Sequence, residues 1–157
     1  MPMQCKLLGF CLLIVCGYLV GDSLALAVRR QEALLREYRL ALALMVQMVS
    51  EGLSSRDIWL KLLEREDSFP EMQLSRSDSL REYRLPGLLP LEINRELDKA
   101  FDEIGCLSKE ALMEKIRSKR RFSDEILQDI VRKRCKAEGL YRKVSLLCAL
   151  ALAILLL

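Results

Sequence analysis

The sequence has two apolar ends that flank a charged middle, and this feature limits the fold more than any other. Residues 144–157 contain one hydroxyl and no charge, and residues 7–28 form a second apolar run whose only charged member is Asp22. All but one of the 25 Lys and Arg residues lie between the two runs, and the exception is Lys6. Because neither run has a polar face to present to water, we expect both to enter a membrane.

The lengths and flanks of these runs predict a topology. As helices, residues 7–28 span about 33 Å and residues 144–157 about 21 Å, against a hydrocarbon core of about 30 Å. The basic residues Arg29 and Arg30 follow the first run, and Arg142 and Lys143 precede the second. Since basic flanks stay in the cytoplasm, we expect transmembrane segments at 7–28 and 144–157 and a cytoplasmic domain at 29–143.

An alternative for the first run is a cleavable signal peptide. Lys6 provides a short positive start, and the sequence Ala25-Leu26-Ala27 fits a cleavage site after Ala27. The protein would then be exported and held by its hydrophobic tail. The basic residues after the run favour an uncleaved anchor, because they oppose export of the chain on their C-terminal side.

Glycines give the first run a possible contact surface for a second helix. Gly9, Gly17 and Gly21 are its only glycines, and the last two form a GxxxG pattern. Small residues let two membrane helices approach closely. We therefore expect these glycines to pack against the tail, which offers Ala149, Ala151 and Ala153.

The middle of the chain has helical periodicity and no strand pattern, which predicts an all-α bundle of about five helices. The first and last helices would extend into the terminal segments. Gly52 is expected to end the first helix and Ser54 or Ser55 to cap the second. Pro90, Ser108 and Ser123 would begin the others. The expected core stripes are Leu34, Leu35, Tyr38, Leu42, Met45 and Val49; Ile58, Trp59, Leu62 and Leu63; Ile93, Leu97, Phe101 and Ile104; Leu112, Met113 and Ile116; and Phe122, Ile126, Leu127, Ile130, Val131 and Cys135.

Residues 67–88 interrupt this periodicity. Ser, Pro, Asp and Arg dominate the segment, and it shows no clean period. Such a long loop is unusual in a compact domain. We expect a mobile loop with at most a short helical turn, and a docking segment is the alternative.

The chemistry that the sequence excludes is clear. The chain has no histidine, so catalytic triads and histidine-ligated metals are ruled out. The usual nucleotide-binding and hydrolase motifs are missing, as is a four-cysteine metal set. We therefore expect no catalytic, cofactor-binding or metal residues, no small-molecule substrate and no enzyme activity.

Two basic clusters, residues 115–121 and 132–136, allow three interpretations. A solvated surface is the simplest, attraction to anionic lipid is the second, and nucleic-acid binding is the third. No aromatic residues alternate with these charges and acidic residues separate the clusters. We expect a solvated surface and no nucleic-acid partner.

The order of these parts resembles a known family. The start, CKLLGFCLLIVCGYLVGDSLALAVRRQEALLREYRLALALM, and the end, EGLYRKVSLLCALALAILLL, resemble the termini of the stage III sporulation protein AB family of spore-forming bacteria. The stretch MVSEGLSSRDIWLKLLERE is similar to the helix–glycine–helix turn of the type II secretion F domain, which that family shares. The resemblance covers the first ~65 and last ~20 residues, and it rests on order and length rather than on one specific motif.

The resemblance implies a non-enzymatic scaffold in the mother-cell membrane that faces the forespore. It implies membership of a sporulation channel or secretion-like complex. By analogy with secretion F proteins, the cytoplasmic helical domain would dock a partner ATPase of that complex at the membrane.

Overall fold

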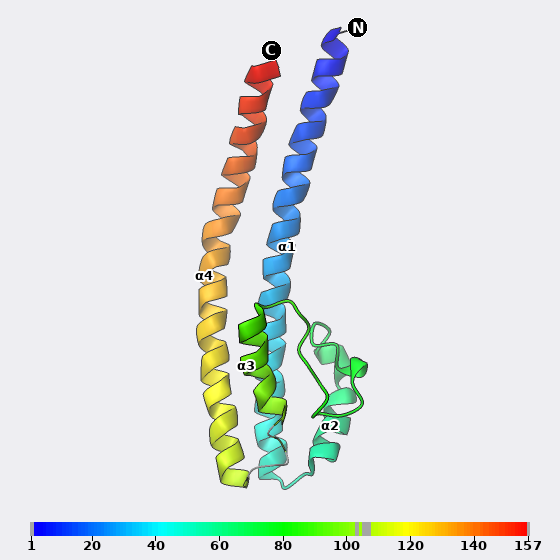
Figure 1. The fold of residues 1–157 in the computed structure, drawn as a ribbon, viewed down its shortest axis with the longest axis vertical. Coiled ribbons are helices and arrows are strands. Elements are labelled where there is room, and N and C mark those ends of the chain that lie inside the picture. The colour runs from blue at the N-terminus through cyan, green and yellow to red at the C-terminus, as the bar shows by residue number, and fades with distance from the viewer. Residues whose placement is uncertain (1, 103, 105–107, 157) are drawn as a thin grey trace. The chain divides into compact units, whose positions relative to one another are not determined.

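The protein is all-α in the part of the chain that the structure describes. The computed structural model describes the backbone of residues 2–102, 104 and 108–156. Side chains are described for residues 25–102, 104 and 108–135, and nearer the ends for residues 15, 18, 19, 22, 23, 143, 144, 147, 148 and 151. Four α-helices and two 3-10 turns make up this part (Figure 1): α1 Pro2–Ser50, α2 Ser55–Leu63, η1 Glu66–Ser68, η2 Leu74–Arg76, α3 Leu91–Asp102 and α4 Lys109–Leu156.

The chain divides into two compact units. Unit 2 is Arg30–Asp129, and unit 1 combines Met1–Arg29 with Ile130–Leu157. The helices α1 and α4 each continue without a break from one unit into the other. Each unit therefore contains one part of α1 and one part of α4.

In unit 2, α1 is the central helix. Its expected stripe, from Leu34 to Val49, is buried throughout, which confirms the periodicity of that segment. Tyr38 ties α1 to α3, because its hydroxyl donates a hydrogen bond of 2.9 Å to the carbonyl oxygen of Leu97. Arg39 ties α1 to α4 through an ion pair of 2.5 Å with Asp124. These contacts join α1 to two other helices of unit 2.

The turn between α1 and α2 follows the sequence expectation. Gly52 has φ +80°, and its N–H donates to the carbonyl of Val49 while Leu53 N–H donates to Met48. These two bonds form the Schellman motif that ends a helix at a left-handed glycine. Ser54 then caps α2, because its Oγ accepts the Asp57 N–H at 3.2 Å.

The loop at residues 67–88 packs into the core, whereas its irregular composition favoured a mobile segment. Tyr83 is 1% exposed, and its hydroxyl donates a hydrogen bond of 2.7 Å to the carbonyl of Met72. Two 3-10 turns occupy part of it. Its apolar residues fall at no helical or strand period, so pattern reasoning could not identify them as core. Those buried are Phe69, Met72, Leu74, Leu80, Tyr83 and Leu85.

The number of helices differs from the expectation of about five. The helices expected to begin at Ser108 and Ser123 are one continuous helix, α4. Ser123 is fully buried, and its Oγ donates to the carbonyl of Arg120 at 2.7 Å, so it bonds back along the helix and does not cap a new one. Cys135, expected on the buried face, is exposed.

Unit 1 exposes large apolar side chains on both of its helical segments. Tyr18 is 68% exposed and Leu147 65%. Among the residues that the structure describes, no helix is both long and apolar enough to cross a membrane. The segments predicted at 7–28 and 144–157 consist largely of residues whose side chains lie outside that description. The surroundings of Gly9, Gly17 and Gly21 also lie outside it.

Candidate docking cleft

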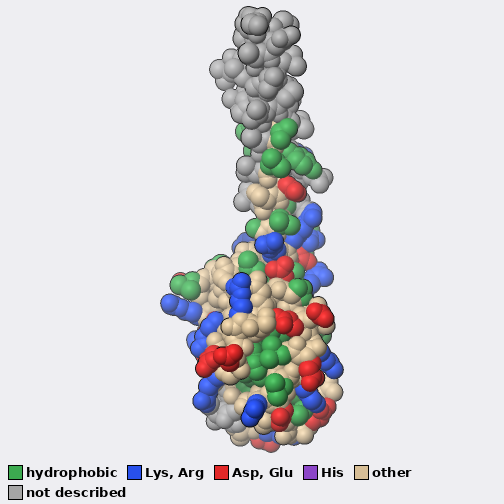
Figure 2. Space-filling view, turned by 90° about the vertical axis from the view of Figure 1, so that its right-hand side faces the viewer, with side chains coloured by type: hydrophobic (Ala, Val, Ile, Leu, Met, Phe, Trp, Pro, Cys, Tyr) green, Lys and Arg blue, Asp and Glu red, His purple; other side chains and the backbone are tan. Residues whose placement is uncertain are grey.

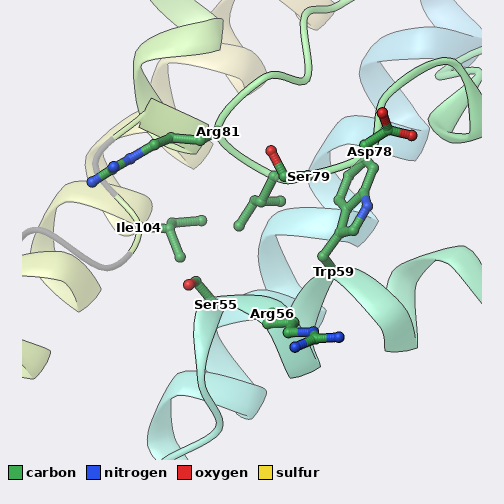
Figure 3. A pocket seen from close by; sticks show the side chains of 8 residues that line it. Ser55, Arg56, Trp59, Asp78, Ser79, Arg81 and Ile104 are labelled. Carbon is green, nitrogen blue, oxygen red and sulfur yellow. The ribbon is translucent and has the colours of Figure 1, made fainter.

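A cleft of about 510 Å³ opens on unit 2 between α2, the loop and Ile104, two residues after the end of α3. The cleft could not be predicted from the sequence, because its residues are far apart in the chain and form no motif. Figure 3 shows its lining side chains from close by. They are Ser55, Arg56, Trp59, Asp78, Ser79, Leu80, Arg81 and Ile104.

The cap of α2 positions one side of the cleft. The Oγ of Ser54 accepts the backbone N–H of Asp57, and the Ser54 hydroxyl donates to the Asp57 carboxylate at 2.6 Å. Both the backbone and the side chain of Asp57 therefore bind Ser54 and hold the first turn of α2. This places Ser55 and Arg56 at the cleft edge, and Trp59 one turn further on.

Two hydrogen bonds position the loop residues that line the cleft, one within the loop and one to α3. The N–H of Tyr83 donates to the carbonyl of Ser79 at 3.1 Å, which closes a turn next to the cleft. The N–H of Leu85 donates to a carboxylate oxygen of Asp98 on α3 at 2.9 Å. These bonds hold the loop at residues 83 and 85, directly after the lining residues 78–81.

A row of aromatic rings lies behind the cleft wall. Trp59 packs on Tyr83 with ring centroids 5.7 Å apart, and Tyr83 meets Phe101 edge-to-face at 5.0 Å. Tyr38 also meets Phe101 edge-to-face, with ring centroids 5.7 Å apart. Rings in such geometry contribute about 0.5–1.5 kcal/mol per pair beyond burial, so they make a rigid wall.

The cleft has an apolar floor and a charged rim. Trp59, Leu80 and Ile104 are each under 5% exposed and line its base. Arg56 and Arg81 extend outward on separate sides in Figure 3, and Asp78 stands near the indole of Trp59. The indole Nε1 is buried, and no hydrogen-bond acceptor meets it within the described structure. An apolar base with charged edges is typical of a surface that binds a side chain of another protein.

Two carboxylates hold the loop against α1 and α3. Burial raises the pKa of Asp98, which accepts the Leu85 N–H. Burial also raises the pKa of Glu37, whose Oε2 accepts the backbone N–H groups of Glu71 and Met72 at 2.9 and 3.0 Å. In both cases the hydrogen bonds from backbone N–H groups oppose the effect of burial. These carboxylates hold the loop in place and do not line the cleft.

The basic cluster at 115–121 does not form a single patch. Lys119 is 7% exposed and pairs with Glu96 of α3, whereas Arg117, Arg120 and Arg121 are exposed. Figure 2 shows basic and acidic side chains interspersed over the visible face of unit 2 around a small group of hydrophobic ones. Lys119 is therefore a structural residue, and the interpretation of the rest of the cluster as a solvated surface stays a prediction.

The residues predicted to flank a membrane are Arg29, Arg30, Arg142 and Lys143. Arg29, Arg30 and Lys143 are exposed, and the side chain of Arg142 lies outside the described residues. Arg29, Arg30 and Lys143 are not among the residues that line the cleft. Within the described part of the chain, no group of three or more Cys, Asp or Glu residues could hold a metal ion.

Comparison with known proteins gives no family: no family model, curated protein or solved structure matches this chain. The resemblance to the stage III sporulation protein AB family thus rests on the sequence pattern alone and stays a prediction.

Proposed function

We propose that the protein is a membrane-anchored scaffold of a sporulation channel or secretion-like complex. Its terminal segments would hold it in the mother-cell membrane that faces the forespore, and its helical unit 2 would dock the ATPase of that complex. The scaffold binds and positions its partners and performs no chemical step itself. The order of segments in the sequence supports the choice of complex.

The cleft is the single observation that carries the docking function. Its floor offers buried apolar surface to a partner side chain, and its rim offers the guanidinium group of Arg56, which can bind a carboxylate in bidentate geometry. The hydroxyls of Ser55 and Ser79 have no histidine beside them to act as a base, because the chain has none. Such a lining suits recognition better than nucleophilic catalysis.

The continuity of the helices supports a mechanical role. The helix α1 carries core residues of unit 2 and also forms part of unit 1, and α4 does the same. A force that the partner ATPase applies to unit 2 would be transmitted along these unbroken helices to the membrane segments. A flexible linker would not transmit it.

A binding measurement with the full chain in lipid nanodiscs tests this proposal. The partner ATPase, labelled with a fluorophore, is titrated with the wild type and with Arg56→Glu, which reverses a charge at the rim. We expect at least about a tenfold weaker Kd for the variant, or about 1.4 kcal/mol. The matched control Arg95→Glu reverses an exposed charge on α3 outside the cleft, and it should leave the Kd unchanged.

Two results would contradict the proposal. If the wild type does not bind the ATPase, docking of this partner is wrong. If Arg56→Glu and Arg95→Glu weaken binding equally, the effect comes from general charge, and the cleft is not the docking surface.

A further inference from the structure

One face of α1 within unit 1 is exposed over about three turns. Its members follow one another at helical spacing and all lie on the same side of the helix. The residues of this face are Val15, Tyr18, Leu19, Asp22 and Leu26, and each of them is exposed. The spacing of three and then four residues from Val15 through Tyr18 to Asp22 is the repeat by which two helices pack along a common line.

Two polar side chains of this face lie deep in the apolar run that is expected to enter the membrane. Tyr18 lies 11 residues after Leu7 and 10 before Val28, which is the middle of the run. Asp22 lies one turn further on, about 9 Å from the end of the run. Tyrosines of membrane helices are enriched at the interface with water, and acidic residues within a membrane face other protein groups. Their position therefore favours a face that contacts protein over one that contacts lipid.

Neither of these side chains finds a partner within its own chain. Among the residues that the structure describes, the Tyr18 hydroxyl and the Asp22 carboxylate make no hydrogen bond or ion pair, and both side chains are exposed. Removing a hydroxyl or a carboxylate from water without a hydrogen-bond partner is unfavourable. The two groups are complementary, because a tyrosine hydroxyl can donate the hydrogen bond that a carboxylate accepts.

We propose that two copies of the chain pack through this face in the membrane, and that Tyr18 of each copy donates a hydrogen bond to Asp22 of the other. Two copies with the same topology are parallel, so a two-fold axis along the membrane normal brings the same face of each helix together. Because donor and acceptor lie one turn apart on one face, this symmetry forms two such bonds in each dimer. Val15 and Leu26 extend the contact on either side. The inference rests on the proposed membrane anchoring.

Energy transfer between copies in vesicles tests the dimer. Cys135, which is exposed, is kept as the labelling site, and the other five of the six cysteines are replaced by alanine. Portions of the full chain are labelled with a donor or an acceptor dye, mixed, and reconstituted in phosphatidylcholine vesicles at a low ratio of chain to lipid. Unlabelled chain is then added during reconstitution, and a specific dimer should lose energy transfer in proportion.

Three variants of the labelled chain separate the contact from general effects. Asp22→Leu removes the acceptor and Tyr18→Phe removes the donor, and we expect each to weaken association about tenfold. Asp22→Leu makes the run more apolar, so it should float with the vesicles at least as well as the wild type while it loses the dimer. The control Ala27→Leu adds a leucine at an exposed position on another side of α1, and it should leave association unchanged.

The outcomes distinguish the dimer from the anchoring. If the wild type floats with the vesicles but shows no energy transfer that unlabelled chain reduces, the dimer is wrong and the anchoring stands. If Asp22→Leu and Tyr18→Phe associate as well as the wild type, these two residues do not form the contact. If the wild type does not float, the anchoring is wrong and the dimer falls with it. Unfolding followed by Trp59 fluorescence should be the same in all these chains, because the substituted positions lie in unit 1 and Trp59 lies in unit 2.

Discussion

At the residue scale, a few buried polar groups hold the irregular loop of unit 2 in place. The hydroxyl of Tyr83 bonds the carbonyl of Met72, and the carboxylates of Glu37 and Asp98 accept backbone N–H groups at either end of the loop. Each bond satisfies a main-chain group that would otherwise be buried without a partner. The sequence could not predict them, because hydrogen bonds between distant residues leave no periodic trace.

The Tyr83 hydroxyl is expected to contribute measurably to stability. Tyr83→Phe keeps the ring contacts with Trp59 and Phe101 but leaves the Met72 carbonyl without its donor. We expect a loss of about 1–3 kcal/mol in the free energy of unfolding. Urea unfolding of the full chain in detergent, followed by the fluorescence of Trp59, the only tryptophan, measures it. The exposed Tyr18→Phe is the control, and an equal change in both variants would contradict the role of the bond.

The Glu96 ion pairs predict a pH dependence. Hydrogen bonds from Lys119 and then Lys99 lower the pKa of Glu96 to about 2 from its usual 4.5. A carboxylate with a lowered folded-state pKa stabilises the fold above its unfolded-state pKa, and this contribution is lost as the pH falls from about 4.5 toward 2. Glu96→Gln should therefore be less stable than the wild type at pH 7 and approach it near pH 2. A difference that is constant over this range would rule out the ion pairs as its cause.

At the element scale, the local sequence predicted the end of α1 and the start of α2 correctly, but it wrongly predicted a break within α4. The helix end at Gly52 was predicted correctly, and of the two caps predicted for α2, Ser54 or Ser55, the structure has Ser54. Ser123 has the composition of a cap, but the helix continues through it because its side chain is buried and bonds back to Arg120. Tertiary burial overrides a local preference of this size.

Two glycines make a matched test of the first helix end. Gly52 has φ +80° with open space around its α-carbon, so Gly52→Ala adds only backbone strain. A left-handed conformation costs a non-glycine residue about 1–2 kcal/mol. Gly87 also has open space and no positive φ, so Gly87→Ala should be close to neutral. Urea midpoints of the two variants provide the measurement, and equal values would show that the conformation of Gly52 is not required.

The continuity of α4 can be tested with proline. Arg121 lies mid-helix and is exposed, so Arg121→Pro removes a helix bond and clashes with the preceding turn, which costs about 3 kcal/mol or more. Glu110→Pro, in the first turn of α4, should cost far less, because the first-turn N–H groups have no partner within the helix. If a break preceded Ser123, proline at 121 would be tolerated. Circular dichroism and urea unfolding distinguish the two outcomes.

At the scale of the whole molecule, the proposed function joins a helical docking unit to a membrane anchor. The all-α class and the core of α1 could be predicted from periodicity, whereas the cleft could not, because α2, the loop and Ile104 come together only in the folded chain.

Co-flotation with vesicles tests most directly whether the protein docks the ATPase at a membrane. The partner ATPase is mixed with phosphatidylcholine–phosphatidylglycerol vesicles that contain the full chain, and the mixture is centrifuged through a density gradient. We expect the ATPase to float with these vesicles, to stay at the bottom with empty vesicles, and to float much less with vesicles that contain Arg56→Glu. If the protein floats and the ATPase remains at the bottom, the protein is an anchor without this partner, and the docking function is contradicted.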